Sequence, residues 1–188
     1  MLLFVGRIQP LKGADVAVTA LAELQRLDGA FLVVVGGPSG PDGPDEVARL
    51  HRLSAELGVE DRVRFVAPQP HEMLSTYYRA ADVCLVPSRT ESFGLAALEA
   101  AACGTPVVGS AVGGLLTLVE HGRTGYLVEG RDPARFAAYV AELVTQPECA
   151  RAMGAAAARV ARRYTWSIAA GRLRRLYQQL TQKQLVEC

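Results

Sequence analysis

The sequence lacks several features that would assign a protein to a class at once. Its four cysteines are far apart and form no C-x-x-C pair, which argues against a zinc site or a disulfide framework. The three histidines match no metal-ligand spacing. No apolar run approaches the roughly 18 residues of a membrane-spanning helix. A formal net charge of +1 among 188 residues argues against a nucleic-acid partner. We therefore expect a globular, cytoplasmic protein with reduced thiols and no transmembrane segment.

Two phosphate-binding motifs are also missing. The turn after the first apolar segment has no G-x-G-x-x-G, because Arg7-Ile8-Gln9-Pro10 occupies it. This argues against a nicotinamide-dependent dehydrogenase. The stretch from Gly6 to Gly13 also lacks the G-x-x-x-x-G-K-[S/T] of a P-loop.

Short apolar segments alternate with helical patterns along the whole chain. This order predicts an α/β fold, with a Rossmann-like six-stranded parallel sheet and helices on both faces. Residues 1–188 are predicted to form one domain. Strands are expected at 2–5, 31–35, 63–66, 83–86, from 106, and at 125–128. Helices are expected at 14–27, 45–57, 70–81, 94–103, 114–119, 133–144, 148–164 and 167–182. Asp45 is expected to cap the second of these.

The stretch from Asp82 to Gly109 organises the rest. It predicts a strand, a polar loop carrying Glu91, a helix carrying Glu99, a glycine stop at Gly104 and another strand. The first backbone amides of such a helix, at Phe93, Gly94 and Leu95, have no partner within it and favour an anion such as phosphate. The two carboxylates can accept hydrogen bonds from sugar hydroxyls. The local chemistry therefore predicts a phosphorylated sugar as ligand.

The loop after the first strand adds positive charge. Arg7 and Lys12 stand beside Gly6 and Gly13. An arginine fork and a lysine point charge suit a diphosphate. In a parallel sheet this loop meets the Glu91 loop at the carboxyl edge, where ligands of open α/β sheets bind.

Six sequence blocks carry a resemblance to a known family. The segment from Glu91 to Glu99 resembles the E-x7-E motif of retaining family-4 glycosyltransferases with the GT-B fold. The other blocks, in the same order and spacing as in that family, are G-R-I-Q-P-L-K-G at 6–13, G-G-P-S-G at 36–40, R-A-A-D at 79–82, C-G-T-P-V-V at 103–108 and G-R-T-G-Y-L-V at 122–128. The resemblance implies one half of a GT-B fold, the half that binds a nucleotide sugar.

The resemblance also implies roles for single residues. Arg7 and Lys12 would neutralise the leaving diphosphate, Glu91 would hold the transferred sugar, and these three would be catalytic. Glu99 would bind the ribose. Phe93, Gly94 and Leu95 would contact the sugar and the distal phosphate. The remaining substrate-binding residues would be Gly6, Gly36 and Gly37 in the nucleotide pocket and Gln69 beside the base. No cofactor and no required metal are expected, and no Asp-x-Asp occurs.

The finer assignment stays open. The blocks look most like inositol-phosphate N-acetylglucosaminyltransferases of mycothiol synthesis, which would make UDP-GlcNAc the donor, and sucrose-phosphate-synthase-like enzymes share some of them. Leu115 follows Gly113-Gly114 where many relatives carry Pro and Glu, which leaves substrate preference there in doubt.

A core strand directly after Met1 leads us to expect the C-terminal half of a longer enzyme, inactive by itself and completed by an N-terminal acceptor-binding domain. The last helix, at about 167–182, would pack either on its own domain or on that missing one. A nucleotide-sugar-binding module without transfer activity is the alternative.

Overall fold

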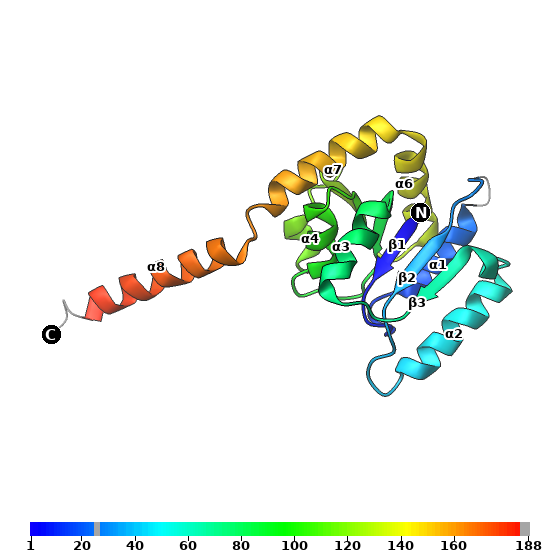
Figure 1. The fold of residues 1–188 in the computed structure, drawn as a ribbon, viewed down its shortest axis with the longest axis horizontal. Coiled ribbons are helices and arrows are strands. Elements are labelled where there is room, and N and C mark those ends of the chain that lie inside the picture. Colours follow the sequence, from blue (N-terminus) through cyan, green and yellow to red (C-terminus); the bar gives the residue numbers. More distant parts are fainter. Residues whose placement is uncertain (25–26, 185–188) are drawn as a thin grey trace.

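Six parallel strands form one sheet at the centre of the molecule. The computed structural model describes residues 1–24 and 27–184. The strand order is β3-β2-β1-β4-β5-β6, and β1, β2 and β3 are labelled in Figure 1. The strands are β1 (Leu2–Val5), β2 (Leu32–Val35), β3 (Val63–Val66), β4 (Val83–Val86), β5 (Val107–Ser110) and β6 (Gly125–Val128). The predicted α/β fold with a six-stranded parallel sheet is confirmed.

The central strands are buried on both faces. Every residue of β2, β4 and β5 is buried, which is why these segments read as continuous apolar runs rather than as an alternating pattern. Successive side chains still point to opposite faces. Leu2 and Phe4 enter one core, whereas Leu3 enters the other.

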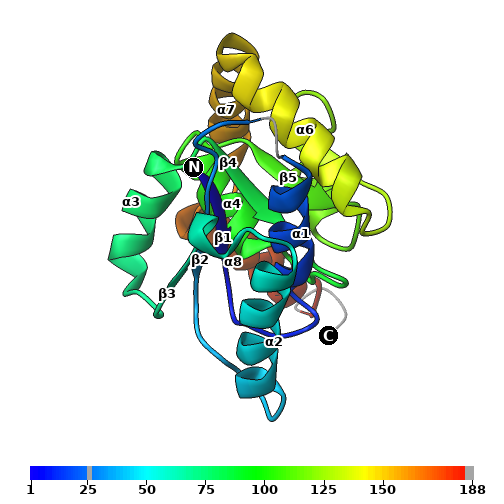
Figure 2. The same ribbon diagram turned by 90° about the vertical axis from the view of Figure 1, so that its right-hand side faces the viewer.

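Helices cover both faces of the sheet (Figure 2). On one face lie α1 (Ala14–Glu23), α2 (Gly43–Glu56) and α6 (Pro133–Thr145). On the other lie α3 (His71–Ala80), α4 (Leu95–Ala102) and the short α5 (Leu115–Leu118). Helix α7 (Pro147–Ala161) packs against α4. A 3-10 turn, Glu60–Arg62, precedes β3. No helix in the described part of the chain is long and apolar enough to cross a membrane.

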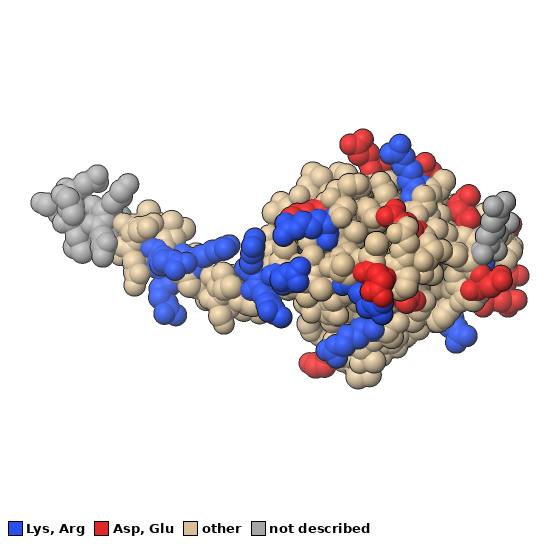
Figure 3. Space-filling model, turned by 90° about the horizontal axis from the view of Figure 1, so that it is seen from above, with Lys and Arg blue, Asp and Glu red and all other residues tan. Residues whose placement is uncertain are grey.

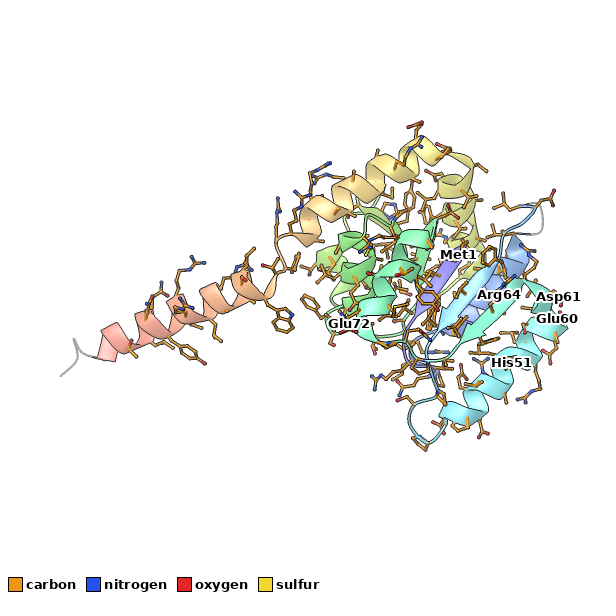
Figure 4. All side chains as sticks on the ribbon, viewed as in Figure 1. Met1, His51, Glu60, Asp61, Arg64 and Glu72 are labelled. Carbon is orange, nitrogen blue, oxygen red and sulfur yellow. The ribbon has the colours of Figure 1, made fainter. Side chains whose placement is uncertain are left out.

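The sheet edge at β3 is protected by charge and by aromatic contacts. Arg64 places its guanidinium 5.5 Å from the ring centroid of Phe31. His51 of α2 packs against Phe65 with the ring centroids 4.2 Å apart and the ring planes tilted by 40°; Figure 4 labels His51 and Arg64. A charged residue on an edge strand discourages pairing with another sheet.

The strand order reverses between β1 and β4, and the two strands part there. Among the described residues of these strands, only Leu2 pairs with Val83 and Leu3 with Cys84, whereas β1 pairs with β2 along all four residues. A crevice at such a reversal, beyond the carboxyl ends of the strands, is where ligands of open α/β sheets bind.

Two local predictions were wrong. Helix α1 ends at Glu23, because Leu24 leaves the helical region with ψ of 42°; Gln25 and Arg26 of the predicted longer helix lie outside the described residues. Helix α2 begins at Gly43, so Asp45 lies in its first turn, where its charge favours the helix dipole, and does not cap it. Gly104 has φ of +79° directly after α4, as the predicted glycine stop requires.

Helix α8 (Trp166–Gln184) extends away from the body (Figure 1). It carries exposed apolar side chains, with Trp166 90% and Tyr177 60% exposed. Arginine side chains lie along it (Figure 3), and its described sequence contains no Asp or Glu. The helix does not pack on the domain that carries it; the domain limits and docking on a further domain stay predictions.

Candidate functional site

A cavity of about 400 Å³ opens where β1 and β4 part. Its floor is formed by the last residues of the two strands, and its walls by the loops that follow them and by the start of α4. The lining residues are Phe4, Val5, Gly6, Arg7, Lys12, Tyr78, Leu85, Val86, Ser88, Glu91, Ser92, Phe93, Gly94, Leu95, Ala96 and Glu99.

An ion pair closes one wall of the cavity. Lys12 Nζ lies 2.7 Å from Glu91 Oε2, and the Ser88 hydroxyl lies 3.3 Å from the same oxygen. The side chains of Lys12 and Glu91 are 25% and 12% exposed. This cation and this carboxylate, 79 residues apart in the chain, therefore neutralise each other in a partly desolvated place.

The N-terminus of α4 faces the same cavity. Gly94 is its N-cap with φ of +95°, and a Cβ there would lie 2.9 Å from Leu115. A side chain at this position would therefore be strained and crowded. Among the hydrogen bonds of the described residues, none is donated by the backbone amides of Phe93, Gly94 or Leu95. These free donors and the positive end of the helix dipole can bind an anion.

Glu99 lies on α4 and lines the same cavity as Glu91. The Tyr78 hydroxyl donates to its Oε2 at 2.8 Å, and His71 Nε2 lies 3.1 Å from its Oε1. Tyr78 is almost fully buried. Burial, together with the charge of Glu99, raises the pKa of Tyr78 far above its usual range. The phenol therefore stays protonated and keeps the carboxylate oriented.

The cavity brings together most of the predicted site residues. Gly6, Arg7, Lys12, Glu91, Phe93, Gly94, Leu95 and Glu99 all line it. Gly36, Gly37 and Gln69 do not. Gly36 lacks a side chain because a Cβ there would lie 1.8 Å from the Gly6 carbonyl oxygen. Gln69 donates its side-chain amide to the Ala67 carbonyl at 2.9 Å.

Tyr78, His71 and Ser88 were missed as site residues from the sequence. No sequence signal connects Tyr78 to a carboxylate 21 residues away. Ser88 stands three residues before Glu91 in the sequence, and this closeness is the only feature that could have linked the two side chains.

Arg131 joins the two loops that carry the ion pair. Its Nε donates to the Pro87 carbonyl at 3.2 Å, and its terminal nitrogen lies 2.9 Å from Asp15 of α1. Gly13, the N-cap of α1, is packed so closely that a Cβ would lie 2.1 Å from the Pro87 oxygen. The loops after β1 and β4 are therefore fixed against each other.

Metal-ligating side chains do not gather in the described part of the chain: it contains no group of three or more His, Cys, Asp or Glu that could hold an ion. Cys84, Cys103 and Cys149 are free thiols.

A family model described as "Glycosyl transferases group 1" matches residues 1–160. The chain is 50% identical to a D-inositol 3-phosphate glycosyltransferase of Thermobispora bispora over 182 residues, which are 94% of this chain and 42% of that protein. It is also 50% identical to the enzyme of that name from Frankia alni, over 94% of this chain and 44% of the relative. The chain thus spans less than half the length of the curated relatives it matches.

Solved structures of similar proteins superpose on nearly the whole chain. Sucrose-phosphate synthase from Thermosynechococcus elongatus superposes with a TM-score of 0.89 at 38% identity, over 97% of this chain and 45% of that one. Anabaena HepE in complex with UDP and glucose superposes with a TM-score of 0.86 at 27% identity, over 94% of this chain and 48% of that one.

Proposed function

The chain belongs to the group 1 glycosyl transferases, and from that premise we propose that it binds a nucleotide sugar as the donor half of a retaining, GT-B glycosyltransferase. The observation that carries the proposal is the single cavity that holds two cations, a free helix N-terminus and two separated carboxylates. A nucleoside diphosphate sugar presents one diphosphate and two polyhydroxy groups, and the cavity offers cations and free amides for the first and two carboxylates for the others.

The residue roles follow this order. The diphosphate binds Arg7, Lys12 and the amides at the start of α4, because these are the cations and free donors of the cavity. The ribose hydroxyls bind Glu99, whose orientation Tyr78 sets. The transferred sugar binds Glu91 beside the diphosphate. Gly36, Gly37 and Gln69 would then border the nucleoside further out.

The reaction is the transfer of a hexose or N-acetylhexosamine to an acceptor. Arg7 and Lys12 stabilise the negative charge that develops on the leaving diphosphate, which is the electrostatic task that many enzymes give to a metal. We therefore propose that no metal and no cofactor is required. Binding energy from Glu91 orients the sugar for departure.

The donor is proposed to be a uridine nucleotide. HepE is described in complexes with UDP and with UDP-glucose. The relatives named D-inositol 3-phosphate glycosyltransferase favour the mycothiol pathway, for which UDP-GlcNAc is our proposed donor. The sucrose-phosphate synthase relative favours UDP-glucose as the alternative.

Calorimetry tests the proposal directly. UDP is expected to bind the 188-residue chain and NAD is not. UDP-GlcNAc and UDP-glucose are compared in the same way. NAD binding with no response to UDP would contradict the proposal.

We also propose that the chain acts together with an N-terminal acceptor-binding half, in the cytoplasm. The exposed apolar side chains of α8 support a surface for that half: Trp166, Ile168, Leu173, Leu176, Tyr177 and Leu180. Joining the two halves and assaying sugar transfer tests this. A joined protein that binds UDP but transfers nothing would favour the alternative, a nucleotide-sugar-binding module without transfer activity.

A further inference from the structure

Arg131 connects the donor cavity to the framework behind it. It stands between β6 and α6, and its charged side chain is only 19% exposed. It is not among the residues that line the cavity, so it does not contact a donor bound there. Its two partners lie instead on the loop after β4 and at the start of α1. Any influence of Arg131 on the donor must therefore pass through these two segments.

The first contact of Arg131 holds the loop that carries Glu91. Its Nε donates to the Pro87 carbonyl at 3.2 Å. Pro87 is buried, and no backbone amide in the described part of the chain donates to its oxygen. A buried carbonyl without a partner is unfavourable, so Arg131 stabilises this conformation of the loop. Ser88, the next residue, places its hydroxyl 3.3 Å from Glu91 Oε2.

The second contact holds the end of the loop that carries Lys12. A terminal nitrogen of Arg131 lies 2.9 Å from Asp15 Oδ1, and the same nitrogen would lie 2.8 Å from a Cβ at Gly13. Gly13 directly follows Lys12 in the chain. One guanidinium group therefore contacts the chain next to Lys12 and the chain that leads to Glu91. Because its nitrogens form a rigid planar fork, it fixes how far apart the two loops lie.

We propose that Arg131 is a positioning residue, which sets the distance between the diphosphate-binding Lys12 and the sugar-binding Glu91. This role rests on the proposed function, because that function assigns the diphosphate and the sugar to these two side chains. Asp15 neutralises the guanidinium at 2.9 Å, so Arg131 acts through the geometry of the loops and not by adding positive charge to the diphosphate. A lysine at this position keeps the charge but has no fork with which to hold both partners.

Calorimetry of the 188-residue chain with UDP and with uridine tests this role. Arg131→Gln should weaken UDP binding about tenfold, because Lys12 then meets the diphosphate in a poorer geometry. Its uridine affinity should stay within twofold of the wild-type value, since the nucleoside has no phosphate for Lys12 to bind. Arg131→Lys should recover part of the lost UDP affinity, because it can still pair with Asp15.

Two other arginines provide matched controls. Arg49 also pairs with Asp15, at 3.6 Å, but its remaining contacts in the described part of the chain are with Glu46. Arg151 pairs with Glu148 on the surface of α7. Arg49→Gln and Arg151→Gln each remove an arginine ion pair without touching the loops after β1 and β4, and both should leave UDP affinity within twofold. They separate the geometry of the site from the general stability of the fold.

Lysine-selective NMR gives a second measurement, made before any nucleotide is added. The sequence contains two lysines, Lys12 and Lys183, so two side-chain signals are expected, and Lys12→Arg identifies the first. Arg131→Gln should move the Lys12 signal toward that of a free lysine, because its pairing with Glu91 loosens. Arg49→Gln should leave the signal in place.

Four outcomes would overturn the role of Arg131. These are an unchanged UDP affinity in Arg131→Gln, equal losses for UDP and uridine, equal losses in Arg131→Gln and Arg49→Gln, and an unmoved Lys12 signal in Arg131→Gln. Should Arg131→Gln not fold, Arg131→Lys serves in the same comparisons. Failure of the proposed function looks different, because UDP would then not bind the wild-type chain, while the Lys12 signal would still report whether Arg131 sets the ion pair.

Discussion

Lys12 Nζ lies 2.7 Å from Glu91 Oε2, so the cation assigned to the diphosphate and the carboxylate assigned to the sugar are bound to each other. A donor must therefore exchange partners with this pair. In the proposed function the diphosphate takes Lys12, and the sugar hydroxyls take Glu91. The pair keeps two charges from lying unpaired in a partly buried place.

The ion pair predicts that the effects of substituting Lys12 and Glu91 on UDP affinity are not additive. Arg7→Ala and Lys12→Ala should each weaken UDP binding by about 1.5–3 kcal/mol, because each removes a charge-assisted contact. Lys12→Ala also leaves Glu91 unpaired beside the phosphates, so adding Glu91→Gln to it should restore part of the loss. Calorimetry of the two single variants and the double variant measures this coupling. Uridine is the control ligand, and equal losses for uridine and UDP would show that the cations do not face the phosphates.

The two glutamates should differ in the ligand that they serve. Glu99→Gln should weaken UDP and UDP-sugar binding alike, by about 1.5–3 kcal/mol, because a carboxylate that accepts two ribose hydroxyls is lost. Glu91→Gln should not weaken UDP binding, because it removes the carboxylate that competes with the diphosphate for Lys12, and it should lower turnover once the chain is joined to its acceptor half. UDP calorimetry of both variants decides the assignment. If Glu91→Gln loses as much UDP affinity as Glu99→Gln, the roles are wrong.

Gly13→Ala should destabilise the domain by about 3 kcal/mol or more, because a Cβ in this left-handed position would lie 2.1 Å from the Pro87 carbonyl oxygen. Gly58→Ala is the matched control. Gly58 has φ of +65° with no atom within 4 Å of its Cβ position, so only the conformational penalty of about 1–2 kcal/mol applies. Urea unfolding of both variants compares them. Equal destabilisation of the two variants would mean that the contact between Gly13 and the Pro87 carbonyl accommodates a Cβ without added strain.

The described thiols should react in a fixed order. In a Cys188→Ser background, a disulfide reagent at pH 8 should modify Cys149 first, because it is exposed, and Cys103 more slowly, because it is half-buried. Burial also raises the pKa of the Cys103 thiol, which lowers its reactive thiolate fraction. Cys84 should react only after unfolding. Mass spectrometry of the modified sites gives the order, and early labelling of Cys84 in the native chain would contradict it.

Alkaline pH should destabilise the folded chain through Cys84. Burial raises the pKa of this thiol to about 12, against about 8.5 in an unfolded chain. A raised folded pKa means that its contribution to stability is complete below about pH 8.5 and falls as pH rises toward the folded value. Unfolding free energies at pH 8, 9 and 10 should therefore decline less in Cys84→Ala than in the wild-type chain. Parallel declines in the two proteins would assign the effect to other groups.

The sequence predicted those parts of the fold that depend on local pattern. The apolar run at Val83–Val86 and the glycine at Gly104 each have one local explanation, and the structure confirms both. The first residue of a helix is harder to predict than its existence. Asp42 and Asp45 both lie near the beginning of α2, and the N-cap position falls on Asp42, whose side chain makes no capping hydrogen bond.

Contacts between distant residues could not be predicted in the same way. Arg131 reaches Asp15, 116 residues away, because it lies just before α6, and α6 packs against α1 on one face of the sheet. The Tyr78–Glu99 contact depends on how α3 lies against α4. The sequence indicated which loops form the site, but not which neighbours orient each carboxylate.

The parting of β1 and β4 determines where ligand binding should be detectable. Hydrogen exchange is ordinarily slowest in the central strands of a sheet. Here the centre carries the opening, since the β1–β4 pairing among the described strand residues ends at Leu3 and Cys84. Protection should therefore fall along β1 toward Val5, whereas β4 stays paired with β5 as far as Val86. A bound donor should restore the protection of the Val5 amide, so that hydrogen exchange in the middle of the sheet reports whether the cavity is occupied.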